Sequence, residues 1–523
     1  MFKNEPLPNA FPRRIPLAAT RTHKLSCLLL ALMMVTGLTG FAQADDNATQ
    51  GETLYQQAQS LEEAMSYTQA MALYNQALPL LEEEGKTELA QACGAAAENL
   101  AIIQMTYPLT FEELKSLIAQ AYPEATDEQI DGWIADESVM KTEYDGAPHY
   151  FSFTVTNLKY HFLDLMYNDE TYQKGYAALV EKIDTIAGTE PEHTWQPYQN
   201  PVKHSATHTI SIPRDELPDT GTIRLWLPIP INTEAQTGVT VDAIEPEEWV
   251  KQPPSTDQDV GVVYMEIPLD ELTDDLSITV KFSFTHYEQR FSVDVDNVGE
   301  YDQASALYQQ YTSSDGNTEI TPEIRAMARQ IVGDETNPYL AARKIYDYIV
   351  NHVEYCLMPH SVLWPRTELT ESAFVYQTQR GDCGSQSIYF SALCRAVGIP
   401  ARSTGGWQLF GGVYSDHFWA EFYLPNYGWL PVDTSFAQLA LFVKDLDEAA
   451  RQTYIDYYFG NQDVLRCTVQ KDTDEPLIPK LNGMGLLPLV IQEPVVEYTL
   501  PTGQIMDQVF TQHWTLTEDS SQE

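Results

Sequence analysis

The chain has 523 residues and a formal net charge of −45, from 75 acidic and 30 basic side chains. Nucleic acids and anionic membranes are bound through Lys and Arg, so this balance argues against both as general partners and indicates a solvated acidic surface. The length suits two to four domains, and a 43% share of hydrophobic residues is enough to build their cores.

The N-terminus has the features of an export signal. Basic residues up to Lys24 precede the apolar run 25–35, and Ala42-Gln43-Ala44 then offers a small-x-small cleavage site. The apolar run is shorter than the roughly 20 residues that cross a bilayer. We therefore predict that residues 1–44 are a cleaved signal peptide, with a retained anchor as the alternative. The mature protein is then periplasmic, bound at the cell surface or extracellular, without a stable membrane span.

Residues 45–189 are predicted to form a helical region with a short β insertion. Ala70, Tyr74 and Ala77 recur at spacings of four and three, as in the second helix of a tetratricopeptide-type (TPR-like) repeat. An Ala-rich helix follows a polar break at 82–85. A plain helical hairpin is the alternative, because a single repeat has no neighbours to bury its faces. A repeat of this type would offer a surface to a protein partner.

The second half of this region alternates between helix and strand signals. Thr126 with Gln129 resembles a capping box ahead of a short helix. A turn signal at 144–146 is followed by alternation over 150–155, which predicts a strand, and helix returns over 158–186. We find no chemistry-bearing cluster in this region.

A β domain is expected at 203–295, after a Pro- and Gln-rich linker at 190–202. Ile223, Leu225 and Leu227 alternate with other residues, and apolar side chains again occupy every second position over 278–284. Strands separated by Pro, Gly and Asp clusters are typical of a small β-sandwich. With the helical regions on either side, the fold class is multidomain α+β.

A further domain is predicted at 320–470. Pro322 stands at a favoured first position of a helix, and a second helix over 339–353 carries an apolar stripe. We expect this stripe to pack beneath a later helix that begins at Cys383. Residues 471–523 form a strand-like, Pro-rich tail that packs against this domain or the β domain.

Three reactive residues follow one another within the 320–470 domain. Cys383 opens a helical pattern, and a thiol at a helix N-terminus is favoured as thiolate by the helix dipole. His417 lies in an aromatic-rich strand, and Asp433 lies at the end of the next strand. Two adjacent antiparallel strands would carry the imidazole and the carboxylate side by side, as a nucleophile, base and orienter require. His352 and His360 are weaker candidates for the base.

The sequence around these residues resembles the transglutaminase-like superfamily. The matching blocks are RGDCGSQS at 380–387, AVGIPAR at 396–402 and GWLPVD at 428–433. The resemblance covers about a fifth of the chain. It implies a papain-like α+β core with Cys383 as nucleophile, His417 as general base and acid, and Asp433 as orienter. Protein crosslinkers, proteases, amidases and peptide deglycosylases all belong to this family, so the resemblance leaves the reaction open.

Further site residues are predicted near the triad. An oxyanion would take one donor from the backbone N–H of Cys383 and a second from a side chain. The candidates for that second donor are Gln377, Gln379, Trp364 and Tyr355. The candidates for lining a substrate groove are Trp407, Trp419 and Trp429, for which burial in the core is the alternative.

These features predict an exported thiol enzyme that hydrolyses peptide or amide bonds, a cysteine peptidase or amidase. Transfer to a lysine amine, as in a protein-glutamine transglutaminase, and a non-catalytic binding or scaffold protein are the alternatives. We expect a peptide or protein substrate and no cofactor. No metal-binding motif occurs in the sequence. Removal of the signal leaves five cysteines, too few for a disulfide framework, and Cys383 is the natural free thiol.

Overall fold

We describe a computed structural model of the chain. The structure describes residues 48–188, 196–217, 219–363, 369–410, 414–481, 489–498 and 510–519. The predicted signal peptide and Trp364 lie outside these ranges. Among the described residues, no helix combines the length and apolar character that crossing a bilayer requires.

Three successive antiparallel helices open the described chain. They are α2 (Gln50–Glu63), α3 (Tyr67–Glu83) and α4 (Thr87–Thr106). Small and apolar residues fill the space between them, among them Ala58, Ala70, Tyr74 and Ala97. An extra break between α2 and α3, not predicted from the sequence, contains Met65 in a left-handed conformation with φ of 56°.

The next segment consists of helices around a β-hairpin. These elements are α5 (Phe111–Ala121), α6 (Asp127–Ile134), β1 (Lys141–Tyr144), β2 (Ala147–Tyr150), α7 (Thr154–His161), α8 (Leu163–Tyr167) and α9 (Glu170–Ala187). The predicted capping box at Thr126 and Gln129 is confirmed. The predicted strand at 150–155 is wrong. Asp145 and Gly146 both have positive φ and close a tight hairpin, so the strands flank this turn and α7 begins at Thr154.

Two antiparallel sheets form the β region. One contains β13 (Asn461–Gln462), β7 (Leu276–Arg290), β3 (Tyr198–Ile212), β16 (Thr511–Asp519) and β5 (Gln236–Glu245); the other contains β15 (Val495–Tyr498), β4 (Thr222–Pro228) and β6 (Val262–Pro268). Ile210 and Phe282 of the first sheet share one apolar cluster with Leu225 and Met265 of the second. The predicted linker at 190–202 is therefore too long, because β3 already begins at Tyr198 and pairs with β7.

The C-terminal tail completes both sheets. Strand β16 pairs with β3 from Thr511 opposite Ser211 to Asp519 opposite Lys203, and β15 pairs with β4. The tail thus packs against the β region, one of the two places expected for it.

The remaining elements build the 320–470 domain and its connections. The helices are α10 (Ala306–Tyr311), α11 (Pro322–Val332), α12 (Pro338–His352), α13 (Glu371–Thr378), α14 (Cys383–Ala396), α15 (Thr434–Ala437), α16 (Leu439–Phe442) and α17 (Glu448–Tyr457). The strands are β8 (Glu354–Tyr355), β9 (Arg380–Gly381), β10 (Ala401–Gln408), β11 (Ser415–Leu424), β12 (Gly428–Val432) and β14 (Arg466–Gln470). Among the described residues, short 3₁₀ helices also occur in the β region as η1 (Arg214–Glu216) and η2 (Leu269–Glu271), after β7 as η3 (Val295–Asn297) and after β8 as η4 (His360–Val362).

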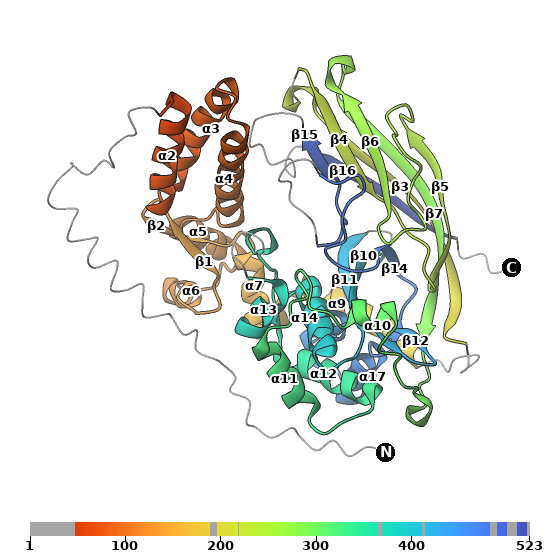
Figure 1. The fold of residues 1–523 in the computed structure, drawn as a ribbon. Helices are drawn as coiled ribbons and strands as arrows, with labels where there is room; N and C mark the ends of the chain where they lie inside the picture. The colour runs from red at the N-terminus through yellow and green to blue at the C-terminus, as the bar shows by residue number, and fades with distance from the viewer. Residues whose placement is uncertain are drawn as a thin grey trace.

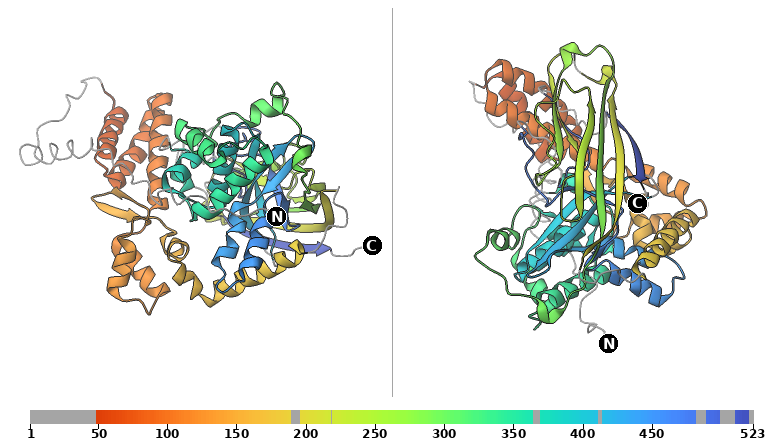
Figure 2. Two further views of the ribbon diagram at one scale, coloured as in Figure 1. Left: turned by 90° about the horizontal axis from the view of Figure 1, so that it is seen from below. Right: turned by 90° about the vertical axis from the view of Figure 1, so that its right-hand side faces the viewer.

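Helix α14 forms the centre of this domain. It packs against β10 and β11 on one side and against α11, α12 and α13 on the others, so nearly all its residues are buried. The strands run in the order β12, β11, β10, β14. Figure 1 shows α2–α4 and the long strands standing on opposite sides of these core elements, and the second view of Figure 2 shows the strands extending away from them.

The cores of the two regions are continuous at β10 and β14. Trp407 of β10 and Cys467 of β14 belong to the same apolar cluster as the two sheets, and Cys383 packs against its edge. The start of α14 therefore lies at the junction between the β region and the 320–470 domain.

Candidate active site

The N-terminus of α14 is held by the residue that precedes the thiol. Asp382 is the N-cap, and its Oδ1 accepts a hydrogen bond of 3.0 Å from the backbone N–H of Ser385. A side chain at Gly381 would meet Ser385 Oγ at 2.4 Å, so only glycine allows this approach. Cys383 is the first residue of the helix and remains partly exposed.

The second and third candidate residues are in direct contact. His417 on β11 donates a hydrogen bond of 2.8 Å from Nε2 to Oδ2 of Asp433. Asp433 follows β12, the antiparallel neighbour of β11, and caps α15 by accepting the N–H of Phe436 at 2.9 Å. Both side chains are buried, with exposed fractions of 4% and 1%. Nε2 is thereby occupied, and Nδ1 is the ring nitrogen left for another partner.

Helix α14 packs against β11 close to the position of His417. The backbone N–H groups of Phe418, directly after His417, and of Gly384 interact with the thiol. The Phe418 ring also covers the first turn of α14, since a side chain at Gly384 would meet it at 3.5 Å. The thiol, the imidazole and the carboxylate thus come from three separate elements that meet at one end of β11.

Arg466 is a site residue that the sequence analysis missed. Its guanidinium is fully buried, lies 3.1 Å from Oδ2 of Asp433 and donates a hydrogen bond of 2.9 Å to Oδ2 of Asp463. It also stacks over the Phe436 ring at 4.2 Å. No local pattern around Arg466 indicated an inward-facing charge.

The protonation states follow from burial and these partners. Burial raises the pKa of Asp433, but His417, Arg466 and its hydrogen bonds outweigh this and leave the pKa below its usual value. Burial lowers the pKa of His417, and the Asp433 charge only partly opposes it. These shifts favour a neutral imidazole beside an ionised carboxylate.

The thiol behaves differently from the sequence-based expectation. Burial, followed by the negative charge of Asp382, raises the pKa of Cys383 above its ordinary value, and the N–H groups of Phe418 and Gly384 only partly offset this. The thiol is therefore protonated in this state. This direction differs from the lowering expected at a helix N-terminus, because burial and then the Asp382 charge outweigh the N–H groups at the sulfur.

Residues 325–434 match the family model of the transglutaminase-like superfamily. This segment is a transglutaminase-like domain. It contains α12, α13, α14 and the strands β10, β11 and β12, of which β11 carries His417. It ends directly after Asp433.

Three relatives share parts of the sequence. An uncharacterized protein of Haemophilus influenzae is 28% identical over 301 residues, which are 49% of this chain and 74% of the relative. The uncharacterized protein YebA of Bacillus subtilis is 26% identical over 23% of this chain and 19% of its own length. A protein-glutamine gamma-glutamyltransferase of Pseudomonas aeruginosa is 32% identical over 12% of this chain and 11% of its own length. The chain thus spans only a minor part of the last two proteins.

Two solved structures resemble parts of the fold. One, from Cytophaga hutchinsonii and named a "putative cysteine protease", has a TM-score of 0.36 and 13% identity over 62% of this chain and 93% of its own. The other, a "putative protease" of Parabacteroides distasonis, has a TM-score of 0.16 and 11% identity over 40% of this chain and 62% of its own.

Of the four predicted oxyanion donors, Tyr355 is the one next to the thiol. Strand β8 pairs in parallel with β9, which sets Tyr355 opposite Gly381, two residues before Cys383. The amide of Gln379 is engaged with the Tyr348 hydroxyl at 2.7 Å and with backbone carbonyls of α13. Gln377 is exposed on α13, and Trp364 lies outside the described residues.

The predicted tryptophan groove is wrong for two of its three members. Trp407 and Trp419 are each only 1% exposed, so neither lines an open surface. The indole N–H of Trp407 donates to the carbonyl of Gln492, and Trp419 packs on the His417 ring. Trp429 stacks on Arg402 at the end of β12 opposite Asp433.

The two alternative histidines lie away from the base position. His352 is exposed on α12, and its Nδ1 bonds the carbonyl of Tyr348. His360 bridges two carboxylates, with Nδ1 2.8 Å from Glu371 and Nε2 2.6 Å from Asp382. Burial lowers the pKa of His360, but Asp382 and Glu371 outweigh it and hold the pKa well above its usual value. His360 is therefore a cation that neutralises the N-cap of α14.

Across the part of the chain that the structure describes, no group of three or more His, Cys, Asp or Glu side chains has the arrangement of a metal site. The titratable groups of the site are paired with one another and with Arg466.

Proposed function

We propose that the protein is an exported thiol acyl-transfer enzyme that hydrolyses peptide or amide bonds. The observation that carries the proposal is the buried hydrogen bond between His417 and Asp433 beside the N-terminus of α14. Such a pair fixes the imidazole tautomer and leaves Nδ1 to act as a base.

The reaction begins with proton transfer within the site. Nδ1 of His417 removes the thiol proton of Cys383 as the sulfur attacks the carbonyl carbon of the substrate. Asp433 accepts the Nε2–H throughout and stabilises the imidazolium that forms. A protonated resting thiol is compatible with this order, because the proton leaves only when substrate is in position.

The second half of the reaction releases both products. The imidazolium gives its proton to the leaving amine as the carbon–nitrogen bond breaks, which leaves a thioester on Cys383. Water then loses a proton to Nδ1 and attacks the thioester, and the thiolate that departs takes this proton back.

The oxyanion is stabilised at the start of α14. The backbone N–H of Cys383 points out of the first turn of the helix, where the helix dipole also favours negative charge. Tyr355 supplies the second donor through its hydroxyl, since β8 holds it beside Gly381.

Transfer to a lysine amine is the second candidate reaction. The observation that favours it is the match of a short segment to a relative named a protein-glutamine gamma-glutamyltransferase. Purified protein is incubated with peptide libraries, with and without a primary amine. Release of free amine and carboxylate supports hydrolysis, whereas incorporation of the added amine into a glutamine peptide supports transfer.

A catalytically silent scaffold is the remaining alternative, and the raised pKa of Cys383 favours it. Iodoacetamide labelling near neutral pH separates the two. Labelling of Cys383 that is slowed in His417→Ala but not in His352→Ala supports catalysis, because His352 is exposed on α12. A labelling rate that is the same in wild type and in His417→Ala contradicts the enzyme proposal.

A further inference from the structure

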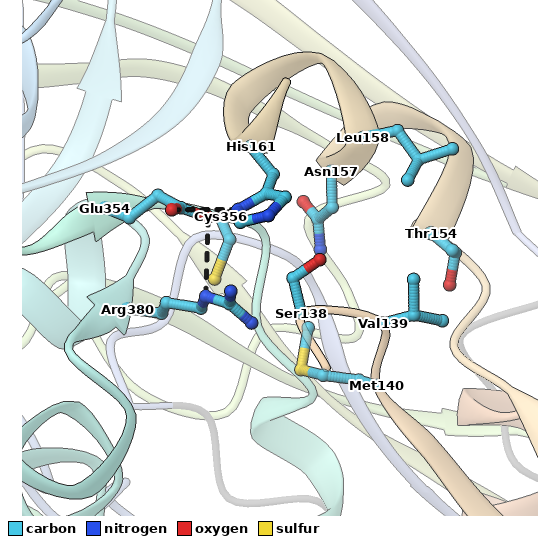
Figure 3. A pocket seen from close by; sticks show the side chains of 10 residues that line it. All are labelled: Ser138, Val139, Met140, Thr154, Asn157, Leu158, His161, Glu354, Cys356 and Arg380. Carbon is cyan, nitrogen blue, oxygen red and sulfur yellow. Dashed lines mark hydrogen bonds and ion pairs between the residues drawn. The ribbon is translucent and has the colours of Figure 1, made fainter. Parts of the chain in front are cut away.

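Helices α7–α9 dock on the transglutaminase-like domain although they lie outside residues 325–434. The side chain of Asn157 on α7 forms two hydrogen bonds with the backbone of Leu357. Its Nδ2 donates to the Leu357 carbonyl at 3.0 Å, and its Oδ1 accepts from the Leu357 N–H at 2.8 Å. His161, one turn later, bonds Glu354 of β8 at 2.9 Å. Figure 3 shows this face of α7 pointing toward Glu354, Cys356 and Arg380 across a small pocket.

This docking brings a tyrosine of α7 to the active site. Tyr160 precedes His161 and meets the ring of Tyr355 edge to face, with ring centroids 4.7 Å apart. Tyr355 is the residue that β8 sets beside Gly381, next to the thiol. Burial raises the pKa of both tyrosines, and Cys383 is among the further causes for each, which agrees with a position of the thiol near both rings.

A second helix extends the aromatic surface. The hydroxyl of Tyr176 on α9 lies 3.3 Å from that of Tyr160. The Phe442 ring, at the end of α16, packs against Tyr160, Tyr176 and Tyr355 with centroid distances of 5.4, 6.1 and 6.5 Å. The four rings thus form one continuous aromatic surface.

These tyrosines differ from the core tyrosines of the same domain. Tyr346 and Tyr389 have no exposed surface, whereas Tyr160, Tyr176 and Tyr355 each remain partly exposed. The nearby charges of Lys159 and Asp169 pair with each other at 2.5 Å. The surface beside the thiol is therefore aromatic, partly open and without an unpaired charge from this pair.

We propose that Tyr160, Tyr176 and Tyr355, with Phe442 beneath them, form a subsite beside Cys383 for an aromatic or large apolar side chain of the substrate. The inference rests on the proposed function, because it defines the substrate class of that same thiol. Ring edges and faces bind another ring at centroid distances of about 4.5–7 Å, and charged side chains lose hydration there without gaining a partner. Helices α7 and α9 thereby determine specificity for a nucleophile that lies on α14.

Alkylation with a matched pair of reagents tests the subsite. Cys383 in the full chain is labelled with iodoacetamide and with N-benzyl iodoacetamide, and both rates are divided by those of a free-thiol peptide. Cys383→Ala gives the background from the other cysteines, of which the four in the described residues are all buried. We expect wild type to favour the benzyl reagent by about tenfold, the range typical of a hydrophobic pocket.

Variants separate a binding role from a structural one. Tyr160→Ala is expected to remove the preference for the benzyl reagent, and Tyr160→Phe to retain it because the ring stays. Tyr67→Ala is the matched control, since Tyr67 stacks on Tyr144 in the hairpin region. An equal change in both labelling rates, or a wild type without preference, overturns the subsite.

A peptide panel makes failure of the subsite distinguishable from failure of the proposed function. Cleavage of peptides with Phe or Leu, but not Glu or Lys, near the scissile bond supports both proposals, with KM for the Phe peptide raised in Tyr160→Ala. Cleavage without side-chain preference overturns the subsite alone. A benzyl preference without any turnover supports the subsite and contradicts the proposed function.

Discussion

Arg466 lies 3.1 Å from the carboxylate of Asp433 and is fully buried with it. The same guanidinium is hydrogen-bonded to Asp463, so one cation is paired with two buried carboxylates. Arg466 belongs to β14, beyond the end of the matched segment at residue 434. The carboxylate that orients His417 is thus fixed from outside the matched segment.

Replacement of Arg466 by Met is expected to destabilise the protein and to raise the pH at which its stability and activity are lost on acidification. Removing one partner of a buried ion pair typically costs about 3–5 kcal/mol, because the other charge stays buried without compensation. The folded-state pKa of Asp433 is now depressed, so its stabilising contribution is present above its unfolded pKa and is lost as pH falls through the folded value. Loss of Arg466 raises that folded pKa, so stability and activity disappear at a higher pH. Urea unfolding and a pH–rate profile measure both effects.

Arg402→Met is the matched control for this experiment. Arg402 is also buried and pairs with Glu421, but it lies beside Trp429 at the far end of the sheet. It is expected to lower stability without moving the acid limb of the activity profile. A similar shift of that limb in both variants would mean that Arg466 acts only through general stability.

Replacement of Asp433 by Asn is expected to lower stability, because Arg466 then keeps only Asp463 as a carboxylate partner, and to remove most of the rate. Asn keeps an acceptor for the N–H of Phe436 at the start of α15, but its amide favours the wrong imidazole tautomer. In a catalytic triad with a Ser nucleophile, replacing the orienting Asp by Asn lowers kcat by a factor on the order of 10⁴. Steady-state kinetics beside circular dichroism measures both properties. A loss below tenfold would show that His417 does not need the carboxylate.

The three candidate residues could be predicted from the sequence because each one lies in a local pattern. Cys383 follows Gly381 and Asp382 at a helix start, His417 lies in an aromatic-rich strand, and Asp433 follows the next strand. Local periodicity predicts such elements and their order along the chain. The hydrogen bond between His417 and Asp433 then follows from antiparallel pairing of neighbouring strands.

Features that depend on distant parts of the chain could not be predicted from the sequence. Arg466 turns inward because Asp433 and Asp463 are already buried, which no window around it reveals. Trp407 faces the core shared with the β region rather than a groove, because both faces of β10 are covered. Strand β16 joins β3 from the opposite end of the chain, and such pairings depend on register and burial across the whole fold.

Replacement of Cys383 by Ala is expected to abolish turnover while leaving the fold intact. The thiol is partly exposed at the first position of α14, where Ala is a good helix former, so the change in stability is within about 1 kcal/mol. Thermal unfolding and the peptide assay measure the two properties. Residual turnover comparable to wild type would assign the chemistry to a different residue.

The bridge formed by His360 predicts a pH-dependent contribution to stability. His360 contacts both Asp382 and Glu371, and these carboxylates hold its folded-state pKa well above the ordinary value. Stabilisation from a raised pKa is fully present below the unfolded value of about 6.5 and is lost as pH rises through the folded value. His360→Gln is therefore expected to cost about 2 kcal/mol at pH 6, reduced by solvent screening of the partly exposed ring, and progressively less at alkaline pH.

The same substitution is expected to slow alkylation of the neighbouring thiol. The Asp382 charge already contributes to the raised pKa of Cys383, and His360 is the cation that offsets that charge. Without the imidazolium, less thiolate forms at a given pH, so the iodoacetamide rate falls. Urea unfolding at pH 6 and pH 10 and labelling near neutral pH are the measurements, with the exposed His352→Gln as control. A stability loss that is equal at both pH values, together with an unchanged labelling rate, would show that His360 is not a cation at the N-cap of α14.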